Sequence, residues 1–282
     1  MPVRLRRLIP FFISIALFAS SNGDAAPPWP NDPPRADSIE WVQDSILGAA
    51  YEALAGDSTL VDEYVRIAGI HKARKNWTQE LRVAERLIRI NPYNAVANFT
   101  FADALLDNSL PDSAILHLCR ALHMEPEFAR ARTTLADAYM MKKAYDSALM
   151  QLDTALLLNP RYAQAHFQRA LVLGTIGRDA EAAESYRIAA ELTPESFSMW
   201  MALARALLKT NDYDQAVEVL AYLRQLRPGS ADAAYLYAEI SMKLGRVEEA
   251  AKAFEEFMLN FPRDRRALDA ERLARRIREG TP

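Results

Sequence analysis

Six prolines recur along the chain at an unbroken interval of 34 residues: Pro92, Pro126, Pro160, Pro194, Pro228 and Pro262. They are drawn from only 15 prolines in 282 residues, so the spacing is not a product of high proline content. A strict period of this length indicates stacked copies of one supersecondary unit. The period predicts how the chain is built, but it does not identify what the chain binds.

The repeating unit has two stripes of small and apolar residues. With each proline at position 32, the blocks span 61–94, 95–128, 129–162, 163–196, 197–230 and 231–264. Position 8 is always alanine, and position 20 is alanine everywhere except at Glu80. Positions 20, 24 and 27 share one helix face, and positions 7, 8 and 11 form a second stripe. We therefore predict two amphipathic helices in each block, over positions 2–14 and 17–30.

The ends of these helices also carry local signals. Position 15 holds Gly177, Asn211 and Gly245 in three blocks, and these residue types tolerate the left-handed conformation that ends a helix. Pro111 lies at position 17, where a first-turn proline is accepted. The proline at position 32 should end the second helix, because the residue before a proline avoids helical geometry.

The repeated residues resemble the tetratricopeptide repeat family, whose pattern is Trp-x2-Leu-Gly-x2-Tyr followed by Ala, Phe, Ala and Pro. One block matches with Trp200, Leu203, Ala204, Leu207, Ala216, Leu220 and Pro228, and another with Leu135, Ala136, Tyr139, Ala148, Leu152, Ala155 and Pro160. The resemblance covers residues 61–264. It implies an all-α fold, a right-handed α-solenoid of about six 34-residue helix-turn-helix repeats with flanking capping helices. The first block departs from the pattern at His71 and Glu80, so we expect it to pack less tightly and to act partly as a cap.

The N-terminal 21 residues have the features of a secretory signal peptide. Three arginines precede an apolar run of 12 residues, Leu8 to Ala19. This run is short for a bilayer span, which needs roughly 20 residues, and it suits the core of a signal. We predict a signal over 1–21 and an exported protein, periplasmic or secreted. The alternative is an uncleaved anchor, and only then would a membrane be a partner.

The segments that flank the repeats are predicted to be a linker and two caps. Residues 22–37 hold five prolines and little apolar content, which is typical of a linker. Residues 38–60 are predicted to contain an N-terminal capping helix, and 265–282 a C-terminal one that begins near Arg265. The C-terminal helix should present one apolar face formed by Ala270, Leu273, Ala274 and Ile277.

The composition offers little support for catalysis. The formal net charge of −3 is mild and argues against bulk nucleic-acid binding. The four histidines, including His117 and His123, have no metal-ligand spacing, and the single Cys119 cannot form an internal disulfide. We therefore predict no catalytic residue, no cofactor, no metal and no small-molecule substrate.

The strongest candidate site is the concave wall that the family forms from its first helices. Positions 5, 9 and 12 supply its apolar flanks and charged midline: Phe99, Asp103, Leu106, Asp137, Met140, Phe167, Leu171, Met201, Arg205, Leu208, Tyr235, Glu239 and Met242. Flexible methionines adapt to varied partners. These residues predict a non-catalytic protein-protein interaction scaffold that binds a peptide segment of a partner in the groove. The alternative function is a membrane-tethered structural or assembly factor with an uncleaved N-terminal anchor.

Overall fold

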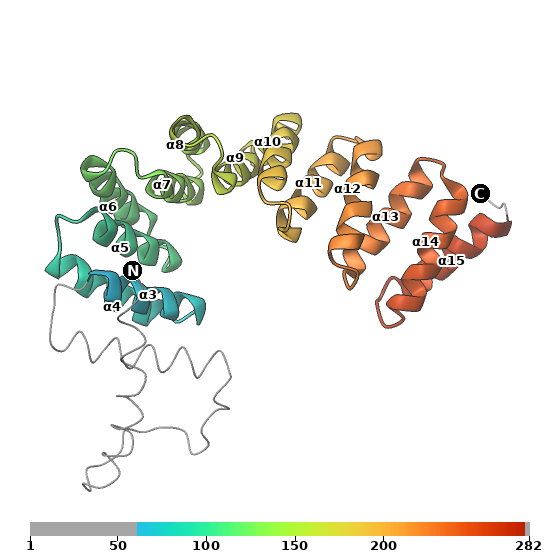
Figure 1. The fold of residues 1–282 in the computed structure, drawn as a ribbon, viewed down its shortest axis with the longest axis horizontal. Coiled ribbons are helices and arrows are strands. Elements are labelled where there is room, and N and C mark those ends of the chain that lie inside the picture. The colour runs from blue at the N-terminus through green and yellow to red at the C-terminus, as the bar shows by residue number, and fades with distance from the viewer. Residues whose placement is uncertain (1–60, 280–282) are drawn as a thin grey trace, which may run out of the picture. The chain divides into compact units, whose positions relative to one another are not determined.

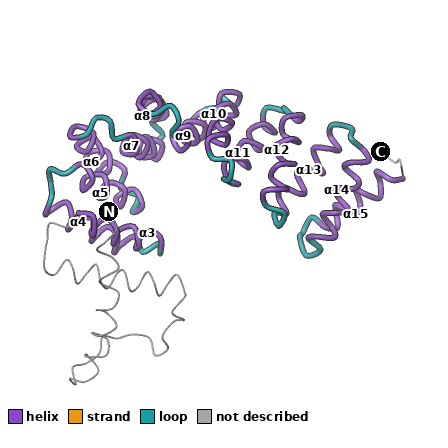
Figure 2. Tube along the Cα trace, viewed as in Figure 1, coloured by secondary structure: helices purple, strands orange, loops and turns teal. Residues whose placement is uncertain are grey.

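The computed structural model describes residues 61–279, and the secondary structure of this range contains helices and no strand (Figures 1 and 2). The predicted signal (1–21), linker (22–37) and N-terminal capping helix (38–60) lie outside the described residues. The helices form six consecutive pairs and one final helix: α3 (Val61–Ala73), α4 (Trp77–Ile90), α5 (Ala95–Asp107), α6 (Pro111–Met124), α7 (Ala129–Met141), α8 (Tyr145–Leu158), α9 (Ala163–Thr175), α10 (Asp179–Leu192), α11 (Phe197–Lys209), α12 (Tyr213–Leu226), α13 (Ala231–Lys243), α14 (Val247–Asn260) and α15 (Ala267–Glu279).

Each helix pair coincides with one 34-residue block. The first helix occupies positions 1–13 and the second occupies positions 17–30, so the predicted bounds are correct to within one residue. The second helix ends two residues before the recurring proline at position 32, here called the period proline. The residue directly before that proline is non-helical at each block end, as at Asn159, whose φ is −138° and ψ is 90°. The proline period therefore fixes where each second helix ends.

The turn inside each pair always uses a left-handed residue at position 15. Gly177, Asn211 and Gly245 have positive φ, as their residue types indicate. The other three blocks carry Lys75, Ser109 and Lys143 at this position, with φ of 55°, 61° and 59°. These residue types gave no signal for this conformation. The tight return of the second helix onto the first imposes it, because the amide at position 16 must reach back to the carbonyl at position 11, as Ala144 does to Tyr139 at 2.9 Å.

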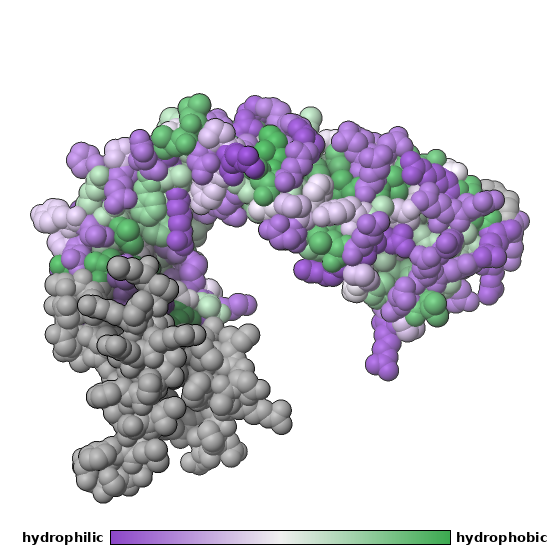
Figure 3. Space-filling model, in the orientation of Figure 1, coloured by the Kyte–Doolittle hydropathy of each residue, from purple (hydrophilic) through white to green (hydrophobic). Residues whose placement is uncertain are grey.

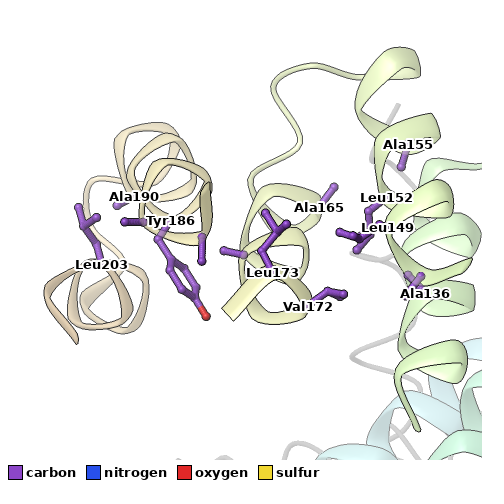
Figure 4. Packing of buried hydrophobic residues seen from close by; sticks show 14 of the residues in the cluster. Ala136, Leu149, Leu152, Ala155, Ala165, Val172, Leu173, Tyr186, Ala190 and Leu203 are labelled. Carbon is purple, nitrogen blue, oxygen red and sulfur yellow. The ribbon is translucent and has the colours of Figure 1, made fainter. Parts of the chain in front are cut away.

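The core runs through the stack as a series of small and large residues. Alanines at positions 8 and 20, among them Ala136 and Ala148, are fully buried where helix backbones approach closely. Positions 24 and 27 are also buried in every block, and they hold larger side chains such as Leu152 and Phe257 as well as alanines. In the central cluster, Leu152 from α8, Leu173 from α9 and Leu203 from α11 lie in one continuous apolar layer (Figure 4). The core is therefore shared between neighbouring repeats.

The helices contact one another in series. Each helix packs against the next one in the chain, from α3 through α15. In addition, α3 contacts α5, α5 contacts α7 and α7 contacts α9, so first helices of neighbouring repeats lie against each other. This arrangement places the first helices α3, α5, α7 and α9 along one side of the stack.

The last helix covers the open end of the repeat array. Ala270 and Ala274 of α15 are buried in the cluster that contains Phe254 and Phe257 of α14, and Leu273 and Ile277 pack beside them. The predicted apolar face of this helix is correct. The helix begins at Ala267, two residues after the predicted start, because Asp264 first forms a turn with Arg266.

The junctions between repeats carry a recurring hydrogen bond. The side chain at position 4 of a first helix reaches the carbonyl oxygen of the period proline six residues earlier. Asn98, Arg132, His166 and Trp200 do so at 2.9, 2.8, 2.9 and 3.0 Å. Four different side chains therefore satisfy the same backbone group, which lies beyond the end of a helix and has no partner within it.

Candidate functional site

The candidate site is the set of residues at positions 5, 9 and 12 of the first helices, here called the first-helix face. Two of its predicted members lie in the core. Phe99 is 5% exposed and Met201 is 8% exposed, and both belong to buried clusters. The interpretation of these two as exposed flanks of a groove is therefore wrong. Phe99 packs against Phe128 at the end of its own repeat, with ring centroids 5.1 Å apart.

Most other apolar members of the first-helix face are half-buried. Phe167 packs edge-on against Tyr186 with ring centroids 5.4 Å apart, and Tyr235 lies 5.3 Å from Phe257. Leu106, Met140, Leu208 and Met242 pack at the edges of the core clusters and retain some exposed surface. Leu171 on α9 is 39% exposed and is the most accessible apolar residue of the set.

The charged midline of the first-helix face is largely paired within the protein. The Lys72 ammonium lies 2.9 Å from Asp103 and 2.6 Å from Asp107. In the second half, the Lys243–Glu239 and Arg205–Asp232 contacts are longer, at 3.8 and 3.9 Å, and both basic side chains are well exposed. A single ammonium, that of Lys72, therefore pairs with both aspartates in the acidic first half, whereas Arg205 remains available to a partner.

A buried carboxyl group lies beneath the acidic half. Glu80 is 2% exposed, and its carboxyl oxygen comes within 4.8 Å of those of Asp103 and Asp107. Burial, followed by the charge of Asp107, raises the pKa of Glu80 to about 7, while Lys72 opposes the shift. Three carboxylates at this spacing could hold a cation, but the Lys72 ammonium already lies between Asp103 and Asp107 and supplies the positive charge.

The sequence indicates individual members of this cluster but does not predict that they converge. Glu80 is recognisable because it replaces alanine at position 20, and the repeat pattern predicts Asp103 on the first-helix face. Their convergence depends on three helices, α3, α4 and α5, which no local pattern brings together. The sequence signal for this cluster is an acidic residue at position 20 of one block together with acidic residues at positions 9 and 13 of the next block.

Asp137 forms a second buried polar contact on the same face. Its carboxylate accepts a hydrogen bond from Gln168 of the next repeat at 2.6 Å. Burial, followed by the nearby Asp103, raises the pKa of Asp137 to about 7. This residue links α7 to α9 and offers little free charge to a ligand.

His117 and His166 have structural partners. His117 lies 3.0 Å from the side-chain oxygen of the fully buried Asn98, and burial lowers the pKa of its ring. His166 lies 2.9 Å from the Pro160 carbonyl. Cys119 is exposed on α6.

The surface seen in Figure 3 alternates in character: hydrophobic patches are separated by hydrophilic side chains. Along residues 61–279, no helix combines the length and apolar character needed to cross a bilayer.

Comparison with known families decides the class of the chain. One tetratricopeptide repeat model matches residues 201–264, and another matches residues 105–171. This chain is a tetratricopeptide repeat protein. The tetratricopeptide fold makes it a protein-protein interaction scaffold, and proteins of this family are generally non-catalytic. A search among curated proteins finds no match to the sequence.

Solved structures with the same fold include several tetratricopeptide proteins. YrrB, described as a tetratricopeptide protein with an unusual peptide-binding site, is 21% identical, with a TM-score of 0.55, over 67% of this chain and 97% of its own. PilF of Pseudomonas aeruginosa is 18% identical, with a TM-score of 0.59, over 82% of this chain and 99% of its own. A tetratricopeptide protein of Thermus thermophilus is 24% identical, with a TM-score of 0.55, over 64% and 99%. At these identities the likeness concerns the fold.

Proposed function

We propose that this tetratricopeptide repeat protein is an exported, non-catalytic scaffold that binds an extended or helical segment of a partner protein along its first-helix face. The observation that carries the proposal is the run of adjacent first helices, α3 to α9, which presents partly exposed apolar residues beside charges. Leu171, on α9, is the best exposed apolar member of the first-helix face, and Arg205, on the following first helix α11, is its best exposed charged member. YrrB, of the same fold, is described as having a peptide-binding site, which supports a peptide as the ligand.

The partner segment should carry an acidic group near the second half of the face. Arg205 is exposed, and its contact with Asp232 at 3.9 Å is long enough to yield to a better acceptor. Asp103 and Asp107 are already paired with Lys72, so a basic residue of the partner would have to compete with that ammonium in the first half. Paired charges contribute to orientation and on-rate more than to affinity.

Site-specific photocrosslinking tests this location. A benzoylphenylalanine at position 171 lies on the first-helix face, whereas one at Leu157, which is 83% exposed on α8, lies on a second helix. In the native host we expect a crosslinked partner from position 171 and none from position 157. Crosslinks from position 157 alone would move the interface to the second helices.

The mass of the protein isolated from its native cells tests export and separates the two functions under consideration. Loss of about 21 residues indicates a cleaved signal and a periplasmic or secreted scaffold. Retention of the apolar run Leu8 to Ala19 in a membrane fraction supports the membrane-tethered structural or assembly factor instead.

A further inference from the structure

A cavity of about 400 Å³ lies between α12, α13 and α14, away from positions 5, 9 and 12 of the first helices. Its lining includes Ala221, Arg224, Pro228, Ala234, Tyr237 and Phe257. The volume falls within the roughly 300–1,000 Å³ range typical of ligand sites.

The cavity has a specific origin in the repeat pattern. Ala234 occupies position 4, where the four preceding repeats place the side chains that reach the period-proline carbonyl. In the preceding repeat this place is filled by Trp200, which packs against Tyr222 at 5.0 Å and donates to Pro194. The equivalents of Tyr222 and Pro194 one repeat later are Glu256 and Pro228, and both line the cavity. The cavity is therefore the space that a position-4 side chain fills in the preceding repeat.

The lining restricts what can enter this space. Its apolar floor includes Phe257 and Ala253, which are 1% and 5% exposed. The Arg224 guanidinium lies 4.3 Å from the Tyr237 ring centroid and 2.7 Å from Glu256, so it disfavours a cationic guest. Glu256 and Pro228 line the cavity, and each carries a hydrogen-bond acceptor; within residues 61–279 no side chain donates to the Pro228 carbonyl in the way that Trp200 donates to that of Pro194.

An apolar floor beside hydrogen-bond acceptors suits a flat apolar ring that carries an N–H donor. We propose that the cavity beside Ala234 binds the indole side chain of a tryptophan supplied by a partner protein, which takes the place that Trp200 occupies in the preceding repeat. The ring packs on Phe257, and its N–H donates to the Pro228 carbonyl. The internal precedent is the Trp200–Pro194 contact at 3.0 Å.

The site is distinct from the first-helix face, although Phe257 on its floor also contacts Tyr235 of that face. Its walls come mainly from the second helices α12 and α14, so a partner could use it whether or not a peptide binds along the first helices. The two proposals can therefore fail separately.

A titration of the full chain with N-acetyltryptophanamide, followed by NMR of alanine methyl groups, tests the proposal. Ala221, Ala234 and Ala253 line the cavity, whereas the fully buried Ala155 reports on the distant core of the third repeat. We expect saturable shifts at the three lining methyl groups, none at Ala155, and a dissociation constant on the order of 1 mM for so small a probe. N-acetylphenylalaninamide lacks the donor and should bind about 3- to 10-fold more weakly. Absent or non-saturable shifts, or equal binding of the two probes, would overturn the proposal.

Variants at Ala234 give an independent check. Ala234→Trp supplies the indole from within, so it should abolish the probe-induced shifts at Ala221 and Ala253 and raise the melting temperature. If that variant does not fold, Ala234→Asn introduces the donor found at position 4 in Asn98 and should weaken probe binding. Leu268→Trp, at an exposed position of α15 outside the cavity, is the matched control and should leave probe binding unchanged. Unaltered binding in a folded Ala234→Trp or Ala234→Asn variant would contradict the site.

Discussion

The indole nitrogen of Trp200 donates to the carbonyl oxygen of Pro194 across 3.0 Å, and so joins the start of one repeat to the end of the repeat before it. The Tyr222 hydroxyl donates to the same oxygen, also at 3.0 Å, and its ring lies 5.0 Å from the indole. A proline that recurs for its effect on the backbone therefore also presents an acceptor that the next repeat uses.

Removal of the Trp200 donor should cost a modest amount of stability. Trp200→Phe keeps an aromatic ring but loses the N–H, and Tyr222 still satisfies the carbonyl. We expect a loss of about 0.5–1 kcal/mol in the free energy of unfolding from urea titration. The double variant with Tyr222→Phe should lose more than the sum of the singles, since the carbonyl then has no side-chain donor. Tyr93→Phe, at a residue that is 92% exposed, should have no effect.

Glycine at Lys143 should stabilise the protein. Lys143 has a φ of 59°, a conformation that costs a non-glycine residue about 1–2 kcal/mol. The larger backbone entropy of glycine in the unfolded chain offsets about 0.5–1 kcal/mol, so Lys143→Gly should gain about 0.5–1 kcal/mol. The reciprocal change, Gly177→Ala at a φ of 81°, should destabilise although a Cβ there meets nothing within 4 Å. A gain from Gly177→Ala in thermal or urea unfolding would contradict the argument.

Stability should depend on pH through Glu80. Its pKa is raised from 4.5 to about 7 in the folded protein, so between these values the folded state binds more protons than the unfolded state. The contribution of Glu80 to the free energy of unfolding is therefore fully present below about pH 4.5, and it is lost as the pH rises through 7. The free energy of unfolding of Glu80→Gln should exceed that of the wild type by about 3 kcal/mol at pH 8 and match it near pH 4.5. The measurement is urea unfolding across this pH range.

The control for this pH dependence is a second acid on the same helix. The side chain of Glu85 is 47% exposed and pairs with Arg89 at 2.6 Å. Glu85→Gln should change stability by a few tenths of a kcal/mol at most. A Glu80→Gln difference that does not vary with pH would show that Glu80 is already ionised when the protein is folded.

Introduction of a charged side chain should strongly destabilise the protein at Met201 but have little effect on stability at Leu171. Met201→Glu places a carboxylate in a core cluster and should destabilise by roughly 3 kcal/mol or more. Leu171→Glu, at a side chain that is 39% exposed, should change stability by less than about 0.5 kcal/mol. Thermal unfolding by circular dichroism distinguishes the two. A stable Met201→Glu protein would return this residue to the binding surface, and only Leu171→Glu is suited to a test of partner affinity.

Much of the fold follows from local patterns in the sequence. The 34-residue period, the alanines at positions 8 and 20 and the proline at position 32 predict the number, type and bounds of the helices between residues 61 and 264. These features are local because helix formation, helix ends and the inner face of a hairpin depend on residues within one block.

The candidate site was less predictable. The sequence placed its residues on the correct helices, but it could not tell that Phe99 and Met201 are covered while Leu171 is exposed. Phe99 and Met201 are covered because side chains from several helices gather around them in the core clusters.

Residue patterns within one block are sufficient to predict the repeating helical hairpins, their boundaries and the apolar stripes that hold them together. The left-handed Lys143, the convergence of Glu80 with Asp103 and Asp107, and the cavity beside Ala234 become apparent only once the helices are packed together. One cause accounts for all three. These features arise where separate helices meet, so their geometry depends on packing between elements rather than on the preference of any one residue.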